Sequence, residues 1–440
     1  MDHFDHLEIA EKKGLFGERS REHLRAVAKP KKVPTDDDMS TASILEYFAK
    51  VPDPRIDRAR LHPLASVLVL SICAVICGAN SFVSIEHFGT ARQAWLKTFL
   101  DLPHGIPSHD TIGRIFGMLD PKALEQAFCD WATALSTLTK GEVVAIDGKT
   151  LRRSFKSAGC SAFVHMVSAW AAGNQMVLGQ VKTEEKSNEI TAIPRLLELL
   201  QITGCLVTID AMGCQKEIAK KIVESKADYM LAVKDNQPAL ATAIEGIFEQ
   251  ALNDPDFASP SNHHGTKDKG HGRVDVRRAW TMNIDAECGA PFDQWSNLRG
   301  IVLVETERTI AGKTSREHRH YITSRTDLTA KSALDAARSH WGIENRLHWV
   351  LDVAFREDDC RVRAGNAAEN FAVIRHIAVN LLKAVQGGLN GKKLGVANKR
   401  LLAGWHNGYL LRVLGITTQS DLDLKQAIGE PSGSDQASSF

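Results

Sequence analysis

The sequence predicts an α/β protein whose core is a mixed β-sheet flanked by helices. Two short runs of β-branched and apolar residues, 143–146 and 206–209, have the composition of buried strands. Each run ends in an aspartate, Asp147 or Asp210, placed where the strand leaves the core. The first strand is followed by two more, and then helices and strands alternate. That order is typical of a mixed sheet covered by helices.

The other elements of this region are predicted from apolar periodicity, with a Gly173-Asn174 turn between two of the strands. They are strands at 163–171, 176–180 and 229–233 and helices at about 189–200 and 216–225. A later segment, about 255–325, is rich in β-branched residues and polar turns. Residues 331–385 follow with a helical pattern.

The chain before the sheet region divides into an arm and a helical domain. Residues 1–41 are charged and show little apolar pattern, so we expect a flexible arm. Residues 42–136 are helical in pattern, and the apolar run 64–78 is too short to span a bilayer comfortably, which predicts a buried helix. Ser108 suits the N-cap of a helix with an outward Arg114. This arrangement is compatible with a helix-turn-helix DNA reader, although most helix pairs bind nothing.

Composition is that of an ordinary soluble globular protein. The 440 residues are 43% hydrophobic and 24% charged, and a net charge of +1 does not by itself indicate a polyanionic partner. Between Arg361 and Arg412, however, there are nine Lys or Arg and one acid, which suits either a phosphate backbone or a solvated helix face. We expect residues 386–440 to form basic helices and a disordered tail. Eight cysteines without a CxxC pair, and a charged N-terminus, favour a cytoplasmic location.

A third acid, Glu344, lies in the helical segment that follows the β-rich one. Carboxylates that are distant in the chain but converge in the fold are what a two-metal phosphoryl-transfer site requires, because Mg²⁺ takes oxygen ligands. Taken alone, each acid is more often a helix cap or a turn residue. Five longer phrases change this balance: Ile106-Pro107-Ser108-His109-Asp110-Thr111, Ala145-Ile146-Asp147-Gly148-Lys149, Lys186-Ser187-Asn188-Glu189-Ile190, Thr208-Ile209-Asp210-Ala211-Met212-Gly213 and His340-Trp341-Gly342-Ile343-Glu344-Asn345. With these phrases in this order, the chain resembles the DDE transposases of bacterial insertion sequences, in particular the H-repeat-associated group, from about Tyr47 to about Leu401.

The resemblance implies a fold, a reaction and its partners. Residues 42–136 would form a helical N-terminal DNA-binding domain, and residues 141–385 a ribonuclease H-like catalytic domain. The β-rich insertion at about 255–325 would lie over the active site and contact the transposon end. Asp147, Asp210 and Glu344 would be the catalytic residues and would hold two Mg²⁺ ions, for which Mn²⁺ can substitute. The enzyme would cleave DNA at transposon ends and transfer the 3′ ends to target DNA. It would work as a homodimer or a larger assembly on DNA.

Basic residues near these motifs are the candidates for DNA contacts. They are Lys149, Arg152, Arg153, Lys186, Arg114 and Arg346. The first three follow Asp147 within six residues, and surface charge is their alternative role. Lys186 lies beside Asn188 and Glu189, for which a structural helix cap is an equal alternative.

The assignment of Glu344 has alternatives, because the residues around it depart from a wider family pattern. Related insertion-sequence transposases carry a Tyr, an Arg and a Lys or Arg at fixed offsets around the catalytic glutamate. At those offsets this chain has Ala337, His340 and Leu351. The H-repeat-associated group shares this departure, so Glu344 stays the candidate. The alternative supporting cations are Arg338, His340 and Arg346. Asp352 and Glu357 are the competing acids, and Asp352 lies close to the same helical face as Glu344.

Two other functions are compatible with the residues. A metal-dependent nuclease of the same fold would cleave DNA without strand transfer. A helix-turn-helix regulator would bind DNA and use its acids structurally, but it would not explain why carboxylates end two buried strands.

Overall fold

The computed structural model describes residues 44–154, 163–184, 188–254, 262–270, 272–285, 288–388 and 392–416. The predicted arm at 1–41, the candidate Lys186 and the end of the predicted tail lie outside these residues.

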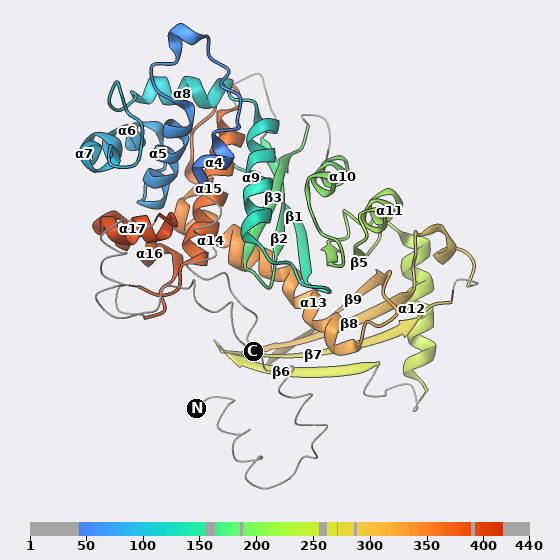
Figure 1. Ribbon diagram of the computed structural model, residues 1–440. Coiled ribbons are helices and arrows are strands. Elements are labelled where there is room, and N and C mark those ends of the chain that lie inside the picture. The colour runs from blue at the N-terminus through green and yellow to red at the C-terminus, as the bar shows by residue number, and fades with distance from the viewer. Residues whose placement is uncertain are drawn as a thin grey trace, which may run out of the picture. The chain divides into compact units, whose positions relative to one another are not determined.

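One mixed sheet organises the part of the chain that the structure describes (Figure 1). Its strand order is β3-β2-β1-β4-β5-β9-β8-β7-β6. The strands are β1 (Val143–Leu151), β2 (Val164–Ala171), β3 (Met176–Lys182), β4 (Leu206–Ile209), β5 (Asp228–Val233), β6 (His263–Gly270), β7 (Arg273–Asn283), β8 (Gly300–Ile310) and β9 (Lys313–Thr323). β1 pairs in parallel with β4, and β4 with β5, whereas the other neighbours are antiparallel. The predicted mixed sheet is confirmed.

The β-rich segment after β5 is part of this same sheet. β9 pairs with β5, so the strands β6 to β9 extend the sheet at its β5 side. The β-rich segment predicted at about 255–325 is therefore a continuation of the central sheet, and its contact with the transposon end stays a prediction. One helix, α13 (Ala330–Ile343), packs against β1 and β4 and also against β6, β7 and β8 of the β-rich segment (Figure 1).

Side-chain alternation along the strands builds a separate apolar layer on each face of the sheet. Val144 and Ile146 of β1 pack with one set of helices: α10 (Glu189–Leu199), α11 (Lys216–Glu224) and α12 (Pro238–Leu252). On the opposite face, Leu206 and Met230 pack against Ala333 of α13. The helices predicted at about 189–200 and 216–225 are therefore present, and the apolar sides that predicted them face the sheet.

The helices before β1 share one hydrophobic core with the helices near the C-terminus. The early helices are α4 (Ile44–Phe48), α5 (Leu64–Ile76), α6 (Phe82–Ala91), α7 (Gln93–Leu96), α8 (His109–Met118) and α9 (Pro121–Leu135). The late ones are α15 (Ala367–Ala384), α16 (Val396–Trp405) and α17 (Asn407–Val413). Buried Asn370 of α15 donates to the carbonyls of Phe116 and Leu119, and buried Asn380 bonds both backbone groups of Val177 in β3. Residues 44–136 are thus tied through α15 to the late helices and to the sheet.

The apolar run predicted to be a buried helix is α5, and all of its residues except Ala65 are buried. By length and composition alone, residues 57–76 could cross a membrane, but 67% of the apolar window is buried inside the protein. α5 packs against α4, α6, α15 and α16. It is therefore a core helix of this fold.

The long helical segment predicted at 331–385 is interrupted twice. After α13, residues Glu344–His348 form a π-helical turn, and α14 (Trp349–Phe355) follows. Arg356 then adopts the left-handed conformation (φ 51°) and ends the helix, so α15 begins only at Ala367. Single π-helical turns are frequent at functional sites.

Candidate active site at the carboxyl ends of β1 and β4

Asp147 and Asp210 occupy equivalent positions on neighbouring parallel strands. The pairing of β1 with β4 runs to Ile146 opposite Ile209, and each aspartate is the next residue of its chain. Thr208, two residues before Asp210, contacts His340 of α13 through its hydroxyl oxygen (3.1 Å). Because side chains alternate along a strand, both aspartates belong to the α13 face of the sheet.

Glu344 reaches the same region from the end of α13. It is the first residue of the π-helical turn and is exposed to solvent. Burial raises the pKa of Asp147 to about 7, and the negative charges of Glu189, Asp210 and Glu344 contribute to the increase. Burial and the charge of Glu189 also raise the pKa of Asp210. Because charge interactions weaken with distance and are screened by salt, the three predicted acids and Glu189 belong to one electrostatic neighbourhood.

The donor chemistry of this neighbourhood suits a hard divalent cation, because it consists of carboxylate oxygens. Among the described residues, no three His, Cys, Asp or Glu side chains already surround a common point at ligand distance. Asp210 instead accepts a hydrogen bond from the backbone N–H of Gly213 (3.2 Å), as in an ordinary aspartate turn. Metal binding would therefore require the carboxylates to turn toward one another.

His348 is a site residue that the sequence did not reveal. Its Nδ1 lies 3.6 Å from Oδ2 of Asp147, and its Nε2 is buried without a hydrogen-bond partner among the described residues. Burial, and then the positive charge of Lys149, lower the pKa of His348 to about 4, so the ring is neutral at pH 7. The π-helical turn places His348 and Glu344 at its two ends.

Glu189 is held at the site from the other face of the sheet. It is the first residue of α10, and its Oε1 lies 2.7 Å from Nε2 of His165 on β2. A Cβ on Gly148 would collide with this carboxylate, so the close approach of α10 to β1 requires glycine next to Asp147. The neighbouring Asn188 caps α10 by accepting from the N–H of Ile190, which confirms the structural alternative for that residue.

Comparison with known families agrees with this geometry. Residues 138–381 match the family described as the transposase DDE domain, and residues 45–132 match the family described as DDE_Tnp_1-associated. The chain belongs to the DDE transposase family. It is 44% identical over 370 residues to "Putative transposase YncI" of Escherichia coli O157:H7, covering 82% of this chain and 93% of that protein. It is also 40% identical over 383 residues to "H repeat-associated putative transposase YhhI" of Escherichia coli strain K12, covering 86% and 98%.

In this transposase, Lys149 is enclosed by carboxylates. Its Nζ lies 2.7 Å from Asp352, 3.2 Å from Asp358 and 3.5 Å from Glu357, and only 11% of the side chain is exposed. Burial opposes the charged form, but the three carboxylates still raise the pKa of Lys149. The predicted DNA contact of Lys149 does not fit this placement, because its ammonium is already engaged. The residue instead links β1 to α14 and to the turn that follows it.

The other candidate DNA contacts are more accessible. Arg152 and Arg153 are exposed, although each has a nearby acid, Asp358 at 3.2 Å and Asp359 at 3.5 Å. Arg114 is exposed on α8, whose N-terminus Ser108 caps as predicted. Arg346 is also exposed.

The competitors of Glu344 have other partners in the structure. Asp352 and Glu357 surround Lys149, and Glu357 also lies 3.3 Å from the buried guanidinium of Arg375. Among the alternative supporting cations, His340 is enclosed next to Thr208, and burial lowers its pKa to about 4. Arg338 and Arg346 line a common pocket beside Glu344.

The basic C-terminal helices of the transposase use part of their charge internally. Buried Lys399 donates to the carbonyls of Leu382 (2.8 Å) and Val385 (2.5 Å), and buried Arg400 donates to the carbonyl of Val75 (2.7 Å). The sequence suggested either a contact with a phosphate backbone or a solvated helix face, and neither fits these two residues, because both are buried and bond to backbone carbonyls. Their role is to join α16 to the helical core.

Proposed function

We propose that this chain is a metal-dependent DNA transposase whose active site consists of Asp147, Asp210 and Glu344. The observation that carries the proposal is the placement of three acids from β1, β4 and the π-helical turn in one electrostatically coupled group. The strand order β3-β2-β1-β4-β5, with β1, β4 and β5 parallel, supports a ribonuclease H-like core. The three carboxylates would hold two Mg²⁺ ions, or Mn²⁺ in their place.

The bound ions would lower the pKa of the attacking hydroxyl group and stabilise the leaving oxygen. The protein contributes a fixed frame for them. The Lys149 ion cluster anchors α14, which directly follows the π-helical turn, to β1 two residues beyond Asp147. His348, being neutral, can orient the Asp147 carboxylate without competing for its charge. Glu189 adds negative charge that favours a cation at the site.

The reaction needs no covalent intermediate with the protein. A water would attack the phosphodiester at the transposon end and release a 3′-hydroxyl, which would then attack a phosphodiester of the target strand. A tyrosine nucleophile, which a covalent intermediate would require, finds little support. Burial raises the pKa of both Tyr229 and Tyr321, and Tyr409 is also buried.

DNA recognition is proposed for α8 and its surroundings. Arg114 and Met118 are exposed on α8 and line a depression of about 720 Å³ that Arg361 also borders. Because two transposon ends must be cut and joined together, the working complex would hold at least two subunits. The protein would act in the bacterial cytoplasm, where its DNA lies.

The test is cleavage and joining of the DNA that flanks the coding region. Wild-type protein with Mg²⁺ or Mn²⁺ should nick this DNA and join its 3′ ends to a second duplex. Asp210→Asn should abolish both steps but keep DNA binding, whereas Glu217→Gln, at an exposed acid on α11, should change neither. Cleavage without joining would indicate a nuclease, and normal cleavage by Asp210→Asn would remove the site from this location.

A further inference from the structure

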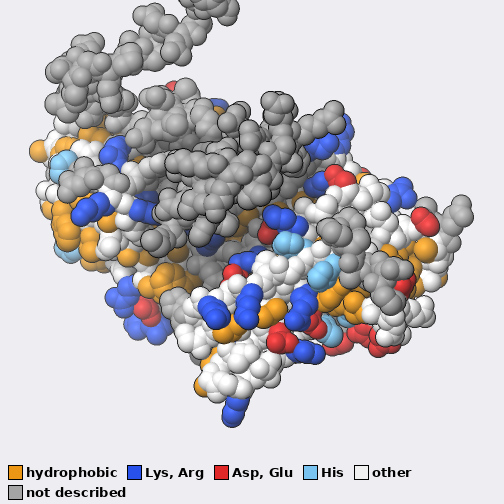
Figure 2. All heavy atoms as spheres, turned by 90° about the horizontal axis from the view of Figure 1, so that it is seen from below, with side chains coloured by type: hydrophobic (Ala, Val, Ile, Leu, Met, Phe, Trp, Pro, Cys, Tyr) orange, Lys and Arg blue, Asp and Glu red, His pale blue; other side chains and the backbone are white. Residues whose placement is uncertain are grey.

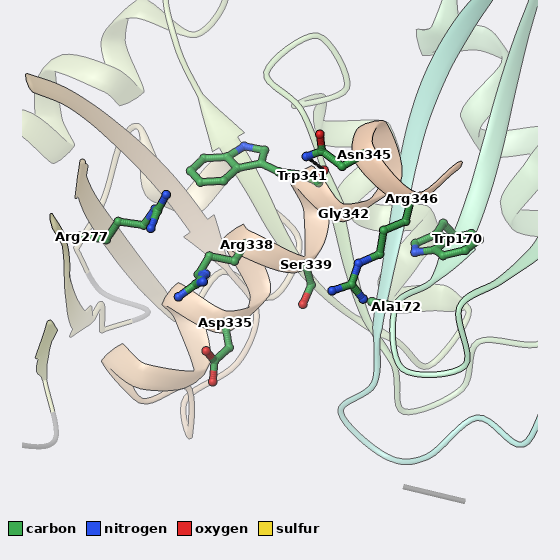
Figure 3. Close-up of a pocket in the computed structure, with 10 residues that line it drawn as sticks. All are labelled: Trp170, Ala172, Arg277, Asp335, Arg338, Ser339, Trp341, Gly342, Asn345 and Arg346. Carbon is green, nitrogen blue, oxygen red and sulfur yellow. Dashed lines mark hydrogen bonds between the residues drawn. The ribbon is translucent and has the colours of Figure 1, made fainter. Parts of the chain in front are cut away.

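A second site of interest is a pocket that lies beside Glu344 on the same helix. Its volume is about 530 Å³, and it lies between β2, β7 and the end of α13. The residues that characterise it are Trp170, Arg277, Arg338, Trp341, Asn345 and Arg346. Figure 3 shows Arg338 and Arg346 on the same helical segment, with Arg277 on the neighbouring strand. Three arginines thus line one cavity.

The positive charge of this pocket is only partly neutralised. Arg277 lies 2.7 Å from Asp268 and 2.8 Å from Asp275, and Arg338 shares Asp268 at 3.3 Å. For Arg346, the described residues provide no hydrogen-bond or ion-pair partner. Burial, and then the positive charge of Arg346, lower the pKa of nearby Lys383 to about 8. The Arg346 end of the pocket therefore has an excess of cations.

The acids at the pocket do not cancel this excess. Asp335 lines the pocket, but its carboxylate lies 2.9 Å from Lys331 on the exposed side of the helix. The surface seen in Figure 2 differs from this pocket, because basic side chains there lie next to acidic and histidine ones. In the β-rich segment, Arg278 pairs with Glu305 and Arg316 with Glu307.

The shape and chemistry of the pocket select a class of ligand. Guanidinium groups bind phosphate oxygens through two parallel hydrogen bonds, and a cavity of several hundred Å³ is of the size that binds small groups. Trp341 forms part of the wall, and Arg319 packs over its ring at 4.5 Å, which holds the indole in place. Glu344 and Asn345 are adjacent in the chain, so a DNA strand with one phosphate at the acids can place a neighbouring phosphate here.

We propose that the pocket between Arg338 and Arg346 binds a backbone phosphate of the DNA strand that is being cut or joined at Glu344. This inference rests on the proposed function, because that function identifies the bound strand as the one being cut or joined. The ability of the arginines to bind phosphate does not depend on it. The pocket would thereby fix the strand relative to the carboxylates. Arg338 and Arg346 would together supply the cation that supports Glu344.

The test measures DNA binding by the full chain in EDTA, so that cleavage plays no part. Labelled single-stranded and duplex DNA of mixed sequence are titrated by fluorescence anisotropy at several salt concentrations. The double variant Arg338→Gln/Arg346→Gln should bind single strands on the order of tenfold more weakly at low salt. Its salt slope should fall by about 0.7, because the two arginines together neutralise one phosphate of a single strand. Lys220→Gln, an exposed cation on α11 at the other face of the sheet, is the matched control.

Each outcome decides the proposal. An unchanged slope in the double variant, or an equal loss in Lys220→Gln, would overturn it even if the protein cuts and joins DNA normally. A reduced slope in a protein that never cleaves DNA would support the pocket and contradict the proposed function. If millimolar inorganic phosphate alone quenches the fluorescence of wild-type protein, but not of a Trp341→Phe variant, and DNA does not compete, the pocket takes free phosphate. That result would also overturn the assignment to DNA. Thermal unfolding of each variant verifies that it is folded.

Discussion

Asp147 and Lys149 lie two residues apart on β1 and point to the same face of the sheet, yet their surroundings are electrostatically opposite. Around Asp147 the nearby charges that raise its pKa are those of other carboxylates, and the basic group recorded at ion-pair distance is the neutral His348. Around Lys149 three carboxylates neutralise one ammonium. A crowded group of like charges is costly without a ligand, whereas a compensated cluster is stable by itself. The difference indicates that the carboxylates around Asp147 form a site for a cation, whereas the Lys149 cluster is structural.

The largest expected effect is on catalysis at Asp147. Asp147→Asn keeps the shape of the side chain but removes the charge that would hold a metal ion, so cleavage should fall on the order of a thousandfold or more. DNA binding in EDTA should survive. The metal-free variant should also melt no lower than wild type, because a buried repulsive charge has been removed. A large loss of thermal stability in Asp147→Asn would show that the carboxylate is structural and would remove the contrast with Lys149.

Lys149→Met should produce the opposite pattern. It leaves Asp352, Glu357 and Asp358 close together without their shared cation, so the free energy of unfolding should fall by about 2–3 kcal/mol. This figure is below the range for fully buried pairs because Asp352 remains 35% exposed. Urea denaturation measures it, with Lys220→Met as the control. If Lys149→Met unfolds like wild type but binds DNA weakly, then Lys149 is a DNA contact after all.

The sequence predicted the surroundings of Asp147 better than those of Lys149. Asp147 and Asp210 follow runs of buried-strand composition, and the parallel pairing of those runs brings them together, so pattern and topology were sufficient. The partners of Lys149 lie more than 200 residues further along the chain, and a local pattern contains no information about them. The same holds for α15, which joins Phe116 and Val177 through single buried asparagines.

His348 was missed for a related reason. A histidine four residues after a glutamate is an ordinary feature of a helix. Its proximity to Asp147 depends on the packing of the π-helical turn against β1, which periodicity does not predict. Glu189 was recognised only as part of a capping motif, because its approach to β1 depends on the missing side chain at Gly148.

His348 lies between the two environments and offers a smaller test of their coupling. His348→Ala removes a group that orients Asp147, so activity should fall about 10–100-fold and the Mg²⁺ requirement should rise. DNA binding in EDTA should not change, and His348→Gln, which keeps a hydrogen-bond donor, should recover part of the activity. His87→Ala, at an exposed position on α6, is the control. A loss of activity at unchanged Mg²⁺ requirement would assign His348 a role apart from Asp147.

The smallest expected effect is the pH dependence of metal binding at Asp147. Its pKa in the folded protein is about 7 against an ordinary value of 3.8, so between these values the folded state holds a proton that the unfolded state has released. Through this group, the metal-free protein becomes less stable as the pH rises across that window. A divalent cation must displace the same proton, so the apparent Mg²⁺ affinity should be about tenfold lower at pH 6 than at pH 8 and should level off above pH 8. Thermal shift with increasing Mg²⁺ at each pH measures this dependence, and Asp147→Asn should abolish it. An equal Mg²⁺ response at pH 6 and pH 8 would mean that Asp147 binds no metal ion or is ionised throughout, and its contrast with Lys149 would then have no functional meaning.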